Sequence, residues 1–161
     1  MRPASCTLCL AAGLCLSLVL TGCSLSPTAG PSVDAGLSIG GVVHGGQQPI
    51  SGAHVYLFAA NTTGYGGAGL AASSLNASVS LLGSAANTTL DAGGGATNGD
   101  YYVTTGSGGT FSITAGDYSC TPNTQVYLYA LGGNPGLTAG TNNAASGLMA
   151  ILGNCPSAGT S

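Results

Sequence analysis

The chain has 161 residues, of which 3% are charged, with a single basic residue and four acidic ones. Proteins that neutralise phosphate groups need lysine or arginine, so this composition excludes nucleic acid as a partner and excludes a polybasic attachment to membranes. The length is that of one ordinary domain.

The N-terminal segment predicts a signal peptide over residues 1–22. A short leader with one positive charge precedes an apolar run of 13 residues, from Leu8 to Leu20. Such a run has the length of a signal-peptide core and is too short to span a bilayer. We therefore expect export through the secretory route.

Residues 20–23 read Leu-Thr-Gly-Cys, which resembles the lipobox of bacterial lipoproteins. The resemblance implies cleavage before Cys23 and attachment of acyl chains, such as palmitate, to this cysteine. The expected partner is then the membrane of the cell envelope, and Ser24 after the cysteine favours the outer membrane. The alternative is an ordinary secretory signal with an incidental cysteine.

The remaining cysteines fit an exported protein. Three of the six would leave with the signal peptide and Cys23 would carry the lipid, so that Cys120 and Cys155 are left in the domain. In an oxidising compartment, a disulfide between these two is the default expectation.

A flexible tether is expected after the lipid-bearing cysteine, over residues 23–36, because this stretch is rich in proline, serine and glycine. Residues 37–155 then form the domain, with a Gly-rich insert near 61–99 that is longer than an ordinary connection. We expect the insert to be a surface excursion or partly disordered, and residues 156–161 to be a disordered tail.

The domain alternates short β-like runs with turn residues. We expect strands at residues 37–44, 52–60, 76–82, 100–105, 110–114 and 124–131, with a turn at 45–50 and a hairpin that joins 100–105 to 110–114. Residues 145–155 fit either a strand or a short helix. About seven strands at this spacing predict an all-β fold, a single antiparallel β-sandwich.

Two of these expected strands look alike. In residues 52–60, Val55 and Leu57 fall on one face, and His54, Tyr56 and Phe58 fall on the other. The letters QVYLYA in residues 124–131 echo HVYLFA in this strand. Two core strands of one sandwich would show this likeness.

The sequence GVVHGGQQPISGAHVYLF resembles the opening of carboxypeptidase regulatory-like (transthyretin-like) domains, and VTTGSGGTFSIT is similar to their later hairpin. The resemblance implies a transthyretin-like sandwich. Together with YLYALGGNPG and LGNC, it extends to uncharacterised acidobacterial surface proteins. In the peptidases that give the family its name, the metal and the catalytic residues lie in a separate domain, so the resemblance implies no activity here.

Catalytic and metal-binding constellations are missing from the sequence. Four aspartates and two histidines do not assemble into an acid–base pair, and His44 and His54 are too few to hold a metal without an acidic or thiolate partner. We therefore expect a protein that is not an enzyme and that uses no cofactor and no metal.

Tyrosine side chains are the one feature with binding potential. Four of them are expected near loops or strand ends, where exposed rings stack on sugars or contact a partner: Tyr65, Tyr101, Tyr102 and Tyr118. The competing interpretation packs these rings on the faces of the sheets. The leading functional hypothesis is a lipid-anchored envelope protein that serves as a structural or protein-interaction module, with surface proteins as partners. The alternative is a carbohydrate-binding module that holds envelope glycan through loop tyrosines.

Overall fold

The computed structural model describes residues 38–62, 73 and 76–155, which all belong to one compact unit of the chain, Pro31–Ser161. The expected signal peptide, Cys23, the tether and the tail lie outside the described residues, as does part of the insert. The described part contains strands and no helix, so the predicted all-β fold is confirmed.

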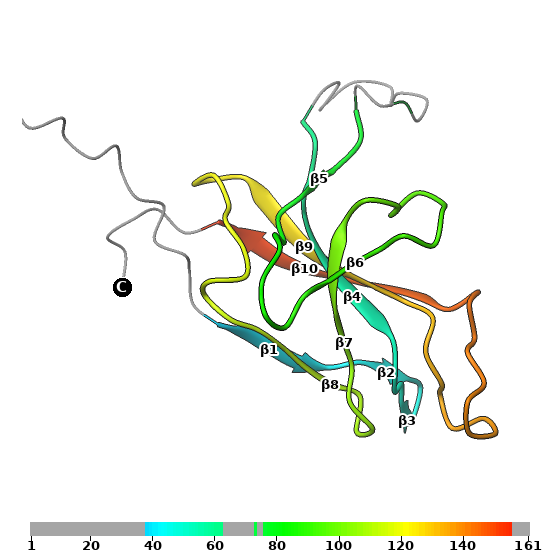
Figure 1. The fold of residues 1–161 in the computed structure, drawn as a ribbon. Coiled ribbons are helices and arrows are strands. Elements are labelled where there is room, and N and C mark those ends of the chain that lie inside the picture. Colours follow the sequence, from blue (N-terminus) through cyan, green and yellow to red (C-terminus); the bar gives the residue numbers. More distant parts are fainter. Residues whose placement is uncertain (1–37, 63–72, 74–75, 156–161) are drawn as a thin grey trace, which may run out of the picture. The chain divides into compact units, whose positions relative to one another are not determined.

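The strands form three antiparallel sheets (Figure 1). The largest has six strands, five of them in the order β10-β9-β4-β7-β6. The sixth, β5, pairs with the end of β4 that β7 does not reach. The two other sheets pair β1 with β8 and β2 with β3. Their bounds are β1 Ile39–Val42, β2 His44–Gly45, β3 Gln48–Pro49, β4 His54–Ala59, β5 Val79–Ser80, β6 Thr89–Leu90, β7 Tyr101–Thr104, β8 Thr110–Ile113, β9 Gln125–Leu131 and β10 Gly147–Asn154.

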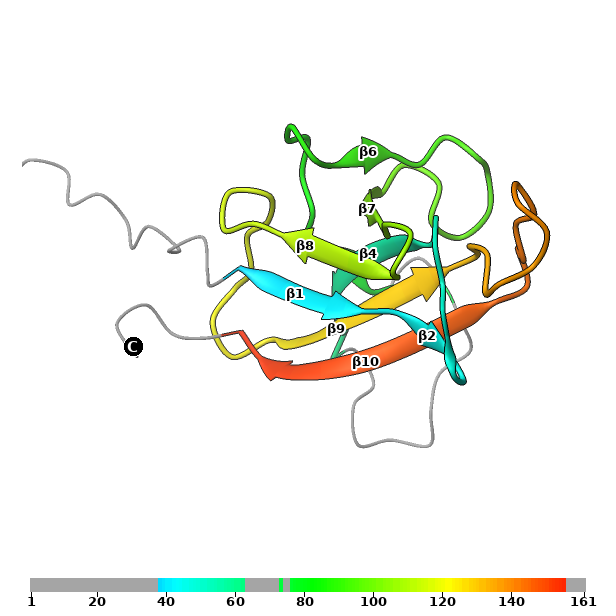
Figure 2. The ribbon, with the colours of Figure 1, turned by 90° about the horizontal axis from the view of Figure 1, so that it is seen from below.

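The hydrophobic core lies between the inner face of the six-stranded sheet and the β1-β8 sheet, and Figure 2 shows β1 and β8 side by side as this second layer. Apolar side chains alternate with outward ones along β4 and β9, as the period of a strand requires. The large sheet contributes Val55, Leu57, Val103, Val126 and Ala130, and Ile113 of β8 and Val43 belong to the same cluster. This arrangement is a two-layer antiparallel sandwich.

The likeness of residues 52–60 and 124–131 has a simple structural basis. β4 and β9 are direct neighbours, and six consecutive residues pair without a shift, from His54 opposite Leu131 to Ala59 opposite Val126. Their similar sequences therefore serve the same position at the centre of one sheet.

The expected hairpin between residues 100–105 and 110–114 is wrong. β7 pairs with β4 and β6, whereas β8 pairs with β1, so the turn between them carries the chain from one layer to the other. Thr105 explains the change of layer. Its buried hydroxyl donates to the carbonyl of Ile50 and accepts from the amide of Ala53, at 2.7 and 2.9 Å.

Residues 145–155 form a strand, β10, rather than a helix. The described part of the insert also has regular structure, because it contains β5 and β6 and returns Leu82 to the core. It is therefore a surface excursion that remains hydrogen-bonded to the sheet.

Candidate binding surface

Aromatic side chains gather on the outer face of the six-stranded sheet. Tyr56 lies opposite Tyr129, and Phe58 lies opposite Tyr127, in the ladder between β4 and β9. The Phe58 and Tyr127 rings are tilted, with centroids 5.7 Å apart. Since directly opposed residues share one face of a sheet, these four rings form two cross-strand pairs on the same side.

Residues of the insert cover the part of this aromatic face that β4 forms. Tyr56 is 1% exposed, and its hydroxyl donates to Oδ2 of Asp91 at 2.7 Å. The Thr97 hydroxyl donates to the same oxygen at 2.7 Å, and the amide of Gly93 donates to Oδ1 at 2.9 Å. One carboxylate therefore fixes the loop over the buried ring.

The electrostatics of this cluster are those of a structural contact. The hydrogen bonds from Gly93, Thr97 and Tyr56 lower the pKa of Asp91, in that order of strength. Burial raises the pKa of the Tyr56 phenol. Both shifts keep the aspartate charged and the tyrosine protonated, so this pair holds its proton in place rather than transferring it.

A second ring contact continues the face toward β7. The His54 imidazole and the Tyr102 ring are stacked, with centroids 3.7 Å apart and planes 9° apart. The Tyr102 ring also lies 5.6 Å from that of Tyr56. Tyr102 is therefore already covered on one ring face by a neighbouring side chain.

The part of the face that β9 and β10 form is more exposed to solvent. β10 adds Met149 opposite Tyr129 and Ile151 opposite Tyr127, and these two aliphatic side chains are 66% and 76% exposed. The two tyrosines beside them are half-buried. We call these four residues the outer strip. An exposed cluster of aromatic, Met and Ile side chains has the composition of protein-binding surfaces.

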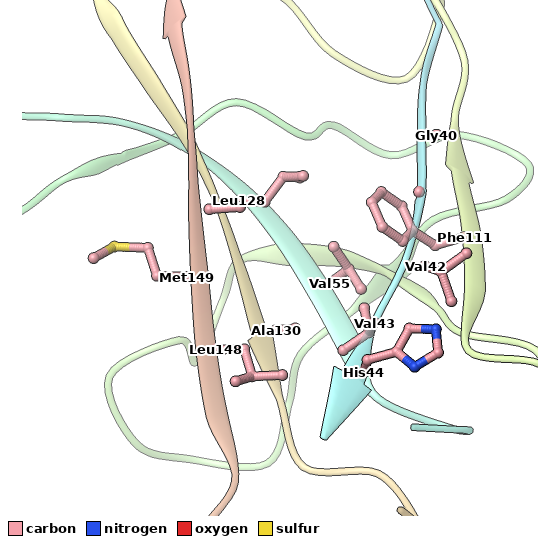
Figure 3. A pocket seen from close by; sticks show the side chains of 12 residues that line it. Gly40, Val42, Val43, His44, Val55, Phe111, Leu128, Ala130, Leu148 and Met149 are labelled. Carbon is pink, nitrogen blue, oxygen red and sulfur yellow. The ribbon is translucent and has the colours of Figure 1, made fainter. Parts of the chain in front are cut away.

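An apolar cavity of about 390 Å³ lies on the other side of the same strands, between β1 and β8 on one side and β9 and β10 on the other. Figure 3 shows Phe111, Val55 and Leu128 around it, while the Met149 side chain extends from β10 in the opposite direction. Gly41 of β1 has room only for hydrogen, because a Cβ there would lie 2.9 Å from the Phe111 ring. The ring thus rests on the strand backbone and forms one wall.

The structure places the predicted tyrosines differently from one another. Tyr118 is 9% exposed and belongs to the core, so its prediction as an exposed loop ring is wrong, and burial raises its pKa. Tyr101 is half-buried and packs against the core. Tyr102 is half-buried in its stack with His54, and Tyr65 lies outside the described residues.

The predicted disulfide is present. Cys120 and Cys155 are bonded, with Cα atoms 6.1 Å apart, and both residues are buried. The bond joins the segment before β9 to the residue after β10, next to a backbone hydrogen bond from the Cys155 amide to the Thr124 carbonyl. It therefore closes the end of the β9-β10 pair.

The remaining described acids also have structural surroundings. Burial alone would raise the pKa of Asp117, but hydrogen bonds from Asn87 and Thr114 outweigh it and lower that pKa. Burial raises the pKa of Asp100. Among the residues that the structure describes, no three His, Cys, Asp or Glu side chains lie close enough together to form a metal site.

Sequence reasoning missed the outer strip. Tyr127 and Tyr129 lie in the segment 124–131 that resembles residues 52–60, and their outward face follows from alternation with Val126 and Leu128. The position of Met149 on this face could not be predicted, because a strand and a helix fit residues 145–155 equally well.

Within the described ranges, no helix has the length and apolar character needed to cross a membrane. Comparison of the chain with protein-family models, curated proteins and solved structures found no match.

Proposed function

We propose that this chain is a non-enzymatic, lipid-anchored protein of the cell envelope whose sandwich domain is a structural or protein-interaction module. The observation that carries the interaction role is the outer strip, because it presents aromatic and aliphatic side chains on an open sheet face. An exposed apolar cluster of this kind costs solubility and is retained where a partner covers it.

The chemistry of two described acids, Asp91 and Asp117, supports a role without catalysis, whereas burial raises the pKa of the third, Asp100. Asp91 holds the insert over Tyr56, and Asp117 holds a turn through Asn87 and Thr114. A general acid or base needs a pKa near the working pH. The pKa values of both carboxyls are lowered instead, away from neutral pH.

The anchor is the second part of the proposal. The lipobox-like sequence at residues 20–23 supports acylation of Cys23 and attachment to the outer membrane. The disulfide agrees with export, since such bonds persist in oxidising compartments. More than one acyl chain is needed for stable anchoring, because a single chain binds membranes only marginally.

The transthyretin-like character of the domain is also a proposal. The first family-like motif runs from β1 to β4 and the second spans β7 and β8, so both motifs lie on strands of the sandwich, although β7 and β8 do not pair as the hairpin that the second motif resembles. The antiparallel two-layer fold supports the resemblance at the level of architecture.

Fractionation of the native host tests the anchor. We expect the wild-type chain in the membrane fraction and Cys23→Ser in the aqueous fraction, because the variant has no thiol to acylate. Cys15→Ser is the matched control, since it alters a leader cysteine and leaves the lipobox intact. A membrane fraction that retains Cys23→Ser, or that loses both variants equally, would contradict lipidation at Cys23.

Carbohydrate binding is the alternative function, and the half-buried pair Tyr127 and Tyr129 supports it better than the loop tyrosines do. Two rings on one open sheet face offer apolar surfaces on which sugar rings stack. Binding on a glycan array that is lost in Tyr129→Ala and kept in Val79→Ala would favour this alternative. Val79 is a suitable control because it is exposed on a different strand.

A further inference from the structure

β10 leaves one backbone edge open at the end of the large sheet. In the described part of the chain, its eight residues pair with β9 and with no other strand. Natural proteins protect such edges with charged side chains, proline or β-bulges. The sequence GLMAILGN contains no charge and no proline, its one bulge lies near its end at Leu152, and four of its side chains are large, apolar and exposed.

The sequence of this edge is nearly a palindrome. Residues 147–153 read Gly-Leu-Met-Ala-Ile-Leu-Gly, which is symmetric about Ala150 except that methionine stands where isoleucine stands on the other side. β10 is regular from Gly147 to Ile151 and has a β-bulge at Leu152, so in an antiparallel pair of two β10 strands centred on Ala150 the regular match covers residues 149–151. Met149 of each copy then lies opposite Ile151 of the other.

The exposures follow the same symmetry. Met149 and Ile151 are 66% and 76% exposed, and Leu148 and Leu152 are 39% and 45% exposed. Residues that lie directly opposite in an antiparallel pair share a face of the sheet. Met149 and Ile151 of each copy would therefore gain an apolar neighbour on their own face of the sheet.

We propose that a second copy of this chain pairs with the first through β10, antiparallel and about a two-fold axis at Ala150. The pairing is isologous, because the same patch is used on both copies. The strand carries no charge, so the two copies do not repel each other at the contact. A palindromic edge is matched to a copy of itself, whereas an unrelated extended peptide would not require the symmetry.

The same contact lies beside the apolar cavity. Leu148 lines that cavity from β10 and is two residues from the proposed axis at Ala150. Figure 3 shows Leu148 on the cavity side of β10. The contact would thus lie along both faces of β10, not along the outer strip alone.

The size of the contact predicts a reversible dimer. Four exposed side chains and one strand backbone make a contact smaller than the ~800 Å² per partner of a stable complex. We therefore expect a weak dimer that dissociates on dilution. This inference does not rest on the lipid anchor, because the contact lies in the folded domain.

Sedimentation of the full chain tests the pairing, with every variant in the same density-matched detergent so that the anchor contributes equally. We expect a monomer–dimer equilibrium between about 1 and 200 µM. The dissociation constant should rise about a hundredfold in Ile151→Lys, because Met149 of each copy then faces a lysine instead of an isoleucine. Val79→Lys is the matched control and should leave the equilibrium unchanged, since Val79 is 58% exposed on β5.

The register is tested by mixing two variants. Met149→Lys and Ile151→Asp should each weaken self-association, and an equimolar mixture should restore a mixed dimer, because lysine and aspartate then face each other. A monomeric wild type at 200 µM, or an unaffected Ile151→Lys with a native circular dichroism spectrum, would overturn the pairing. A mixture that stays as weak as its components would overturn the register about Ala150.

Discussion

The Asp91 carboxylate accepts hydrogen bonds from one amide and two hydroxyls, and one of those hydroxyls belongs to a tyrosine that is 1% exposed. A buried phenol that loses its acceptor costs about 1–3 kcal/mol. The consequences of this single side chain are therefore measurable as stability.

We expect Asp91→Ala to lower the free energy of unfolding by about 2 kcal/mol, because the Tyr56 hydroxyl is left without its acceptor. Denaturant unfolding at neutral pH measures the loss. Tyr56→Phe removes the donor instead and should cost less, since the carboxylate keeps its bonds to Gly93 and Thr97. Equal costs for both variants would contradict this account, because they would mean that the bonds from Gly93 and Thr97 add nothing to stability.

The pH dependence of the same variant has a definite sign. The pKa of Asp91 is lowered in the folded chain, so its contribution is fully present above the ordinary aspartate pKa of about 4 and is lost as pH falls through the lower folded value. The difference in stability between wild type and Asp91→Ala should therefore shrink on acidification below about pH 4. A difference that grows there would contradict the lowered pKa.

Tyrosine placement shows what a sequence can and cannot settle for single residues. Tyr56 and Phe58 were assigned correctly to the face opposite Val55, because alternation in a central strand is local. The burial of Tyr118 was not predictable in this way. It depends on a bridge to Leu82, a residue of the insert.

At the scale of elements, the close approach of residues 50–53 to the end of β9 requires a glycine at position 133. Its backbone has φ 89°, and a Cβ would lie 2.5 Å from the Ile50 side chain and 2.8 Å from the Ala53 amide. The adjacent Asn134 forms a bridge with Ser51. The junction between β9 and the loop before β4 thus leaves no space for a side chain.

We expect Gly133→Ala to destabilise the chain by more than about 3 kcal/mol, since it adds a steric clash to the strain of a left-handed backbone. Gly140→Ala is the matched control, with φ 82° and no atom within 4 Å of its Cβ, and should cost about 1 kcal/mol. Thermal or denaturant unfolding measures both. Similar losses for the two variants would contradict the close packing at Gly133.

The strands were predictable where their signals were local, and the pairing was not. β4 and β9 follow from alternation, but the short Gly-rich turn between β7 and β8 predicts a hairpin that the structure does not contain. The turn changes layers through the contacts of Thr105 with Ile50 and Ala53, which are more than 50 residues away in the chain. β10 remained ambiguous because both of its faces are apolar, which removes the period that distinguishes a strand from a helix.

For the whole molecule, the disulfide agrees with the export that the proposed anchor would require. Cys120 and Cys155 close a loop with a sequence separation of 35, and a crosslink of this length stabilises a fold by roughly 4 kcal/mol in the chain-entropy view. The proposed acylation of Cys23 would hold this domain at the envelope surface, where high local concentration would favour pairing through β10. The composition alone excluded nucleic acid as a partner, whereas the residues proposed to contact a partner could be identified only from the fold.

The most direct measurement of the proposed function is the intact mass of the protein recovered from the envelope fraction of its native host. We expect the mass of residues 23–161 with acyl groups on Cys23, lighter by the two hydrogens lost in the Cys120–Cys155 bond. A chain that begins elsewhere, or that begins at Cys23 without acyl groups, would contradict the lipid anchor.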